Sequence, residues 1–113
     1  MKAIFTALLS LLFVLSFSFA AAGAQETKPS VEYGKKLFSD PSLGTNGKSC
    51  ASCHDEAALK KFAAQDSWFG GEAPRLEDAI NFCIKGSLGG KPQPRNSVIL
   101  KSIAMYIKSF KKE

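Results

Sequence analysis

The strongest chemical signal in the sequence is the run Cys50-Ala51-Ser52-Cys53-His54. Two thiols three residues apart can each form a thioether with one vinyl group of the same porphyrin. The adjoining histidine then reaches the iron from that face, so one turn of chain supplies all three bonds. The run therefore predicts one covalently attached haem c, held by Cys50 and Cys53, with His54 as the proximal ligand of its iron.

Three other interpretations compete with haem attachment. A thioredoxin-like redox pair needs a βαβ setting, which the sequence pattern does not provide. A structural zinc site needs about four ligands, yet His54 is the sole histidine and Cys83 the sole other cysteine. A disulfide between Cys50 and Cys53 leaves His54 without a role. Haem attachment is the interpretation that uses all three residues.

Cys83, the third cysteine of the chain, is a candidate for the opposite side of the iron. It shares one predicted helical face with Leu76, Ala79 and Ile80, and a core or a haem would cover such a face. A buried, inert thiol is one alternative, and in an exported protein an odd cysteine can also pair with another molecule. Met105 lies inside the last predicted helix at a spacing that suits packing, so we expect it to fill the core.

The elements that must position these residues are predicted to be short helices joined by loops that contain glycine and proline. No segment has the pattern of a convincing strand, which indicates an all-α class with about four helices. The predicted helices cover residues 30–39, 55–64, 75–85 and 97–110. Ser30 and Ser97 are suitable N-caps, and Gly86 is expected just beyond the third helix.

The N-terminal residues 1–24 have the pattern of a secretory signal peptide. A basic residue precedes an apolar run, and Ala22 and Ala24 form an A-x-A-like cleavage site. We expect cleavage after Ala24, export to the periplasm, and a mature single domain of residues 25–113 without stable membrane insertion. The alternative is an uncleaved membrane anchor, because residues 4–24 are just long enough to span a bilayer.

Size and charge narrow the possible functions. The mature segment keeps 89 of the 113 residues, close to the lower limit at which an apolar core stabilises a fold without help. A buried porphyrin would supply much of the missing apolar volume. Removing Lys2 leaves 14 basic and 10 acidic side chains, a mild net charge of +4 that two haem propionates would lower further. We therefore predict no nucleic-acid partner.

These residues together resemble the monohaem, class I-like cytochromes c. Besides the attachment run, the match includes Gly34 and Phe38 in the first helix and Tyr106 in the last. The family crosses these two helices at a small residue and aromatics. The resemblance thus implies a cytochrome c-like fold around one haem, in which Gly34 lets the Tyr106 ring approach. The chain departs from the family because no methionine, its common sixth ligand, lies between His54 and Ser97.

A second resemblance concerns the segment 80–107, with its stretches Ile80–Gly86, Gly90–Pro92 and Met105–Ile107. It is similar to the haem domains of thiosulfate dehydrogenases and of sulfur-oxidation cytochromes. In those domains a cysteine at the position that matches Cys83 binds iron opposite the histidine. The resemblance therefore implies that Cys83 is the sixth ligand. If Cys83 does not bind, the iron is five-coordinate and open to small ligands.

Two classes of function follow from these expectations. The favoured one is a one-electron carrier, not an enzyme, that serves periplasmic redox proteins through an exposed haem edge and a small, transient contact. The alternative is the haem subunit of an enzyme that oxidises a sulfur compound such as thiosulfate, with Cys83 taking part in the chemistry. A domain of this size leaves little room for a substrate pocket. A haem protein that binds small ligands is a third, weaker hypothesis.

Overall fold

The computed structural model describes residues 26–111, so the predicted signal peptide lies outside the described residues. Five α-helices follow one another in this range: α1 (Val31–Phe38), α2 (Cys50–Cys53), α3 (Glu56–Ala63), α4 (Leu76–Gly86) and α5 (Val98–Lys108). Two short 3-10 helices lie between them, at Pro41–Leu43 and Phe69–Gly71. Residues 26–111 contain no strand, only an isolated bridge between Trp68 and Ala73. No helix in this range is long and apolar enough to cross a membrane. The predicted all-α class is confirmed, and the helix that was not among the four expected is α2, which contains the two cysteines of the attachment run.

The first and last helices begin where the sequence places a capping side chain. The Ser30 hydroxyl accepts a hydrogen bond from the Tyr33 amide at 3.0 Å, and the Ser97 hydroxyl accepts one from the Leu100 amide at 3.2 Å. Each bond satisfies a backbone donor that has no partner inside its helix, and replacing such a cap with alanine costs about 1 kcal/mol. Both predicted helix starts are confirmed.

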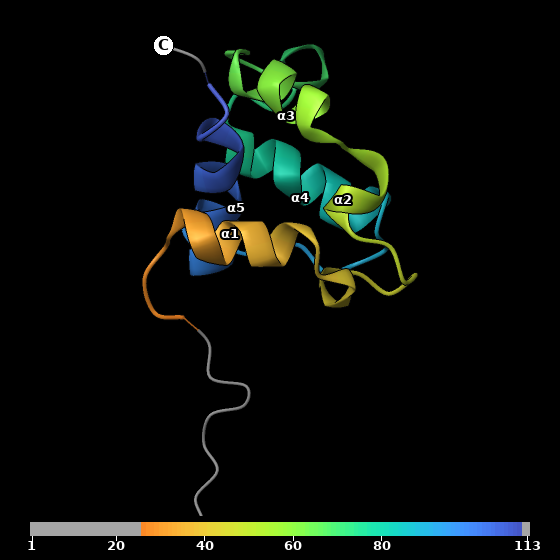
Figure 1. Cartoon of the computed structure of the whole chain (residues 1–113). Coiled ribbons are helices and arrows are strands. Elements are labelled where there is room, and N and C mark those ends of the chain that lie inside the picture. The colour runs from red at the N-terminus through yellow and green to blue at the C-terminus, as the bar shows by residue number, and fades with distance from the viewer. Residues whose placement is uncertain (1–25, 112–113) are drawn as a thin grey trace, which may run out of the picture.

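Helices α1 and α5 cross each other (Figure 1), and Gly34 lies where they meet. A Cβ atom added at Gly34 would lie 2.8 Å from the Cβ of Tyr106 and would overlap the backbone of Ser102. The Tyr106 ring packs edge-on against Phe38, with 5.4 Å between ring centroids. The small residue therefore lets the two helices approach, as the sequence predicted.

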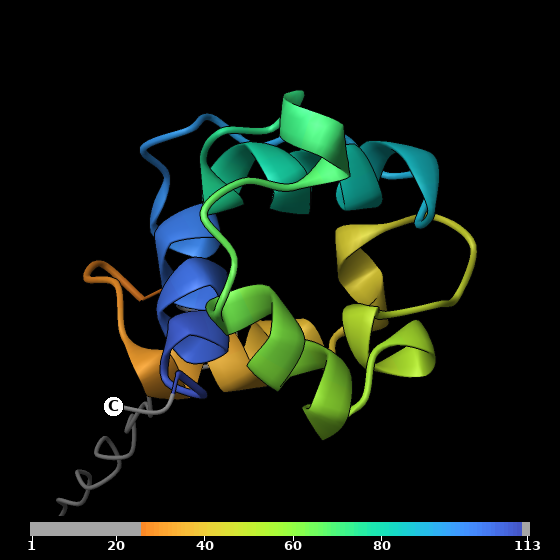
Figure 2. The same cartoon turned by 90° about the horizontal axis from the view of Figure 1, so that it is seen from above.

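The buried core lies where these helices meet. Figure 2 shows α4 on one side of the domain and α2 and α3 on the other, with α5 beside them. The buried side chains come from every long helix and from the loops before and after α4. The larger ones are Leu37, Phe38, Leu59, Leu76, Ile80, Ile84, Leu88, Leu100, Ile103 and Ile107. Because several of these residues also line a cavity, core packing and the candidate site share the same side chains.

Two sequence-based expectations for the helices are wrong. Met105 was expected in the core but is 40 % exposed. It lies two residues from both Ile103 and Ile107, which places it about 200° around α5 from these buried neighbours. Gly86 was expected just beyond its helix but is the last residue of α4.

Candidate haem site

A cavity of about 430 Å³ lies among the helices, within the range of roughly 300–1,000 Å³ that is usual for ligand and cofactor pockets. All four candidate site residues, Cys50, Cys53, His54 and Cys83, line this cavity. Most of the remaining wall is apolar, formed by Phe38, Phe62, Trp68, Phe69, Leu76, Ala79, Ile80, Phe82, Leu88, Ile103 and Ile107. The fold thus brings together two segments that are far apart in the sequence.

One wall is formed by α2, a single helical turn, and the residue after it. At the start of the turn, the Ser49 amide donates to the Ser52 hydroxyl at 2.9 Å. At its end, the His54 amide donates to the Cys50 carbonyl at 3.1 Å. These local bonds hold both thiols and the imidazole on one turn. They are the geometric basis on which the sequence prediction of haem attachment depends.

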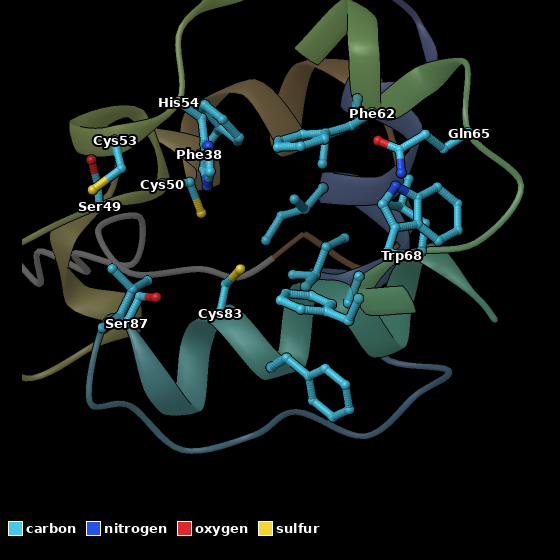
Figure 3. Close-up of a pocket in the computed structure, with 18 residues that line it drawn as sticks. Phe38, Ser49, Cys50, Cys53, His54, Phe62, Gln65, Trp68, Cys83 and Ser87 are labelled. Carbon is cyan, nitrogen blue, oxygen red and sulfur yellow. The ribbon is translucent and has the colours of Figure 1, made fainter. Parts of the chain in front are cut away.

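The His54 imidazole is restricted by an aromatic neighbour. It packs edge-on against Phe62 of α3, with 5.0 Å between ring centroids and an interplanar angle of 79°. Both side chains lie on the same side of the cavity (Figure 3). A fixed ring orientation is what an axial histidine ligand would require. Phe62 of α3 therefore helps to orient the candidate ligand that follows α2.

Cys83 occupies the facing wall, on α4. Leu76, Ala79 and Ile80 are buried on the same helical face, as their spacing predicted. The thiols of Cys83 and Cys50 point into the cavity from opposite sides (Figure 3). The Cys83 thiol on α4 therefore faces the turn that carries Cys50, Cys53 and His54 across the cavity.

The surroundings favour the neutral form of two of these thiols. Burial raises the pKa of Cys50 to about 11, and the neighbouring Cys83 contributes to the rise. Burial also raises the pKa of Cys83, with a further contribution from Cys53. All three cysteines are free in the structure. A thiolate at position 83 therefore needs a positive ion such as haem iron beside it to hold its negative charge.

A bare metal ion does not fit the residues available. Within residues 26–111, no three side chains of His, Cys, Asp or Glu come close enough together to hold one. A structural zinc site, which needs about four ligands, is therefore not supported by the arrangement of these side chains. A cofactor that brings its own metal needs fewer ligands from the protein.

Trp68 supplies an independent observation that fits a haem. Its indole Nε1 is buried and has no hydrogen-bond partner among the described residues. A buried donor without a partner costs about 1–3 kcal/mol. Trp68 lines the cavity, and the propionates of a bound haem would be hydrogen-bond acceptors that suit such a donor. No sequence pattern distinguished Trp68 from the other aromatic residues, because only its burial reveals the unpaired donor.

An all-α domain whose apolar cavity contains a Cys-x-x-Cys-His turn has the features of a c-type cytochrome. Residues 28–112 match the model of the family described as di-haem cytochrome c peroxidase, and the chain belongs to this family. No curated protein and no solved structure gives a significant match. Family membership implies haem c with its iron and haem-based electron transfer. The finer resemblances to monohaem class I cytochromes and to thiosulfate dehydrogenase domains stay predictions.

Proposed function

We propose that this protein is an exported, periplasmic cytochrome that carries one electron at a time on a single haem. Cys50 and Cys53 would attach the haem, His54 would bind its iron as the proximal ligand, and Cys83 would be the sixth ligand. The observation that carries the proposal is that His54 and Cys83 line opposite walls of one apolar cavity that also contains both attachment thiols. An iron with both axial positions filled can change its charge without exchanging a ligand, which suits a carrier.

The loop before α5 supports Cys83 as the sixth ligand. None of residues 89–102 lines the cavity. The Asn81 side chain fixes this loop to α4, since its amide nitrogen donates to the Gln93 carbonyl and its oxygen accepts from the Gln93 amide, both at 2.8 Å. Asn81 itself does not line the cavity. The loop is therefore held away from the haem position, and α4 provides the facing side chain.

One haem per chain is part of the proposal. The matching family is described as di-haem, whereas this sequence has one Cys-x-x-Cys-His run and one histidine. Electron exchange then needs a partner that has its own redox centre, reached through a small, transient contact of the kind that redox pairs form. We infer that the partners are other periplasmic redox proteins.

The cavity wall argues against the alternative of a sulfur-oxidising enzyme subunit. An oxyanion such as thiosulfate needs positively charged or strongly donating groups. The lining residues include no lysine and no arginine, and the imidazole of His54 is assigned to iron. The wall instead suits the apolar faces of a porphyrin, which supports the carrier.

Two measurements on the holo-protein test this function. Its mass should equal that of the chain from residue 25 plus one haem, because thioether bonds survive denaturation. The ferric electron paramagnetic resonance (EPR) spectrum should show low-spin iron with thiolate and histidine as axial ligands. A mass equal to the bare polypeptide would contradict attachment, and a high-spin spectrum would contradict six-coordination.

A further inference from the structure

The segment just before α2 is hydrogen-bonded to the segment just after α4. The Thr45 amide donates to the Leu88 carbonyl at 2.9 Å, and the Thr45 hydroxyl donates to the Gly89 carbonyl at 2.7 Å. The Asn46 side-chain amide donates to the Ser87 carbonyl at 2.9 Å. We call these three bonds the clasp. Figure 2 shows the chain ahead of α2 meeting the end of α4.

The two segments cross so closely that glycine is required on both. A Cβ atom added at Gly44 would lie 2.5 Å from the Cβ of Leu88, and one added at Gly90 would lie 3.0 Å from the Cα of Gly44. Gly89 has a φ of +66°, and a Cβ there would lie 2.9 Å from the Thr45 hydroxyl. Tight backbone contact and the clasp together fix the separation of the two segments.

The clasp joins the two walls that carry the candidate iron ligands. Ser49 and Cys50 follow it on the attachment side and line the cavity, and Ser87 and Leu88 line the cavity on the other side. The amides of Ser87 and Leu88 donate to the Cys83 carbonyl at 2.9 and 3.0 Å. The carbonyls of Ser87 and Leu88 in turn accept hydrogen bonds of the clasp, from Asn46 and Thr45. The Cys83 backbone is therefore linked to Thr45 and Asn46, just ahead of α2, through one intervening residue.

We propose that Thr45 and Asn46 are positioning residues that set the distance between Cys83 and the haem attachment turn. This inference rests on the proposed function, because that distance matters to the iron only if Cys83 binds it. An iron–sulfur bond tolerates little displacement of its ligand. A clasp that ties the end of α4 to the attachment segment keeps the sixth position filled and closed to external ligands.

The test removes both side-chain bonds of the clasp with Thr45→Val and Asn46→Ala in one holo-protein. Both bonds are exposed, so thermal stability should change little. Losing groups that orient a metal ligand changes metal affinity by about 10- to 100-fold. We therefore expect the ferric protein to bind added imidazole at least about tenfold more tightly, measured by optical titration. The thiolate-ligated low-spin EPR signal should broaden or fall.

The matched control is Asp78→Asn, because Asp78 lies on α4 as Cys83 does. This change weakens an ion pair to Arg95 of the loop before α5, with 2.9 Å between the charged atoms. Asp78 does not line the cavity, so its imidazole affinity should equal that of the parent. A second pair of variants uses backbone contact. Gly44→Ala must displace Leu88, whereas the methyl group added by Gly86→Ala has no atom within 4 Å apart from its chain neighbours and the backbone of its own helix. Imidazole affinity should rise for Gly44→Ala alone.

Two outcomes separate this inference from the function on which it rests. If Cys83→Ala opens the iron but the clasp variants titrate like the parent, the positioning role is overturned and the Cys83 assignment stands. If the parent spectrum is unchanged by Cys83→Ala, the proposed sixth ligand is wrong, and the positioning role fails with it. If the clasp variants melted at a lower temperature but bound imidazole like the parent, the clasp would stabilise the fold without positioning Cys83.

Discussion

At the scale of single residues, the identity of the sixth iron ligand sets the redox behaviour. A thiolate donates electron density and stabilises ferric iron. Cys83→Ala should therefore raise the reduction potential and let water or added imidazole reach the iron, as measured by spectroelectrochemistry and EPR. Met105→Leu is the control, because Met105 is 40 % exposed and does not line the cavity. If Cys83→Ala left the spectrum and the potential unchanged while Met105→Leu altered them, methionine ligation would be indicated instead.

Trp68 offers a second prediction at this scale. Trp68→Phe keeps an aromatic ring but removes the N–H that we expect to donate a hydrogen bond to a haem propionate. The propionate charge would then be less well stabilised, so the reduction potential should fall, and the free energy of unfolding should drop by about 1.5–3 kcal/mol.

The same bond can be observed directly, because the chain has a single tryptophan. The indole N–H of the ferrous protein should give one nuclear magnetic resonance signal that exchanges slowly with solvent. Exchange as fast as in an unfolded peptide would contradict the hydrogen bond to the propionate.

The residues of the site differ in how far the sequence could reveal them. Cys50, Cys53 and His54 lie on one turn, so their spacing alone predicts the chemistry. The helical face of Cys83 was also predictable from its neighbours, but its position opposite the attachment turn depends on how α4 packs. The unpaired donor of Trp68 and the clasp of Thr45 arise only from contacts between distant segments, and no local pattern encodes them.

At the scale of elements, the crossing of α1 and α5 depends on Gly34. An added methyl group would overlap the backbone of Ser102, and the helices would have to separate. Overpacking of this kind costs about 1–3 kcal/mol, so Gly34→Ala should lower the thermal unfolding temperature of the holo-protein. Gly86→Ala should unfold close to the parent temperature, because its added methyl group meets no atom within 4 Å apart from its chain neighbours and the backbone of its own helix. Equal melting temperatures for the two variants would show that the crossing tolerates a side chain.

The helices were more predictable than the way they pack. Ser30 and Ser97 cap the helices that they were expected to cap, because a cap is a contact within one turn. Met105 was placed wrongly because its apolar character was taken as a sign of burial, although its spacing from Ile103 and Ile107 puts it on another side of α5. α5 is apolar on more than one side, so its buried face is decided by contacts with α1, α3 and α4.

At the scale of the whole molecule, the cavity and the core are built from the same residues. Leu76, Ile80, Ile103 and Ile107 are buried in the core and also line the cavity. Helices α3 and α4 both pack on α5, and their side chains face each other across the cavity (Figure 3). A porphyrin in this position would contact both helices. We therefore expect the stability of the whole domain to be coupled to the cofactor.

Folding should accordingly depend on haem. In Cys50→Ala with Cys53→Ala, covalent attachment is impossible, and the apolar walls of a cavity of about 430 Å³ lose their partner. A domain of this size buries only about 60 % of the surface that its unfolded chain exposes, which leaves little reserve for that loss. We expect a largely unfolded chain that proteases cut rapidly and that shows no sharp thermal transition by circular dichroism. Native helix content with a cooperative transition would show that the protein side chains form a sufficient core without haem.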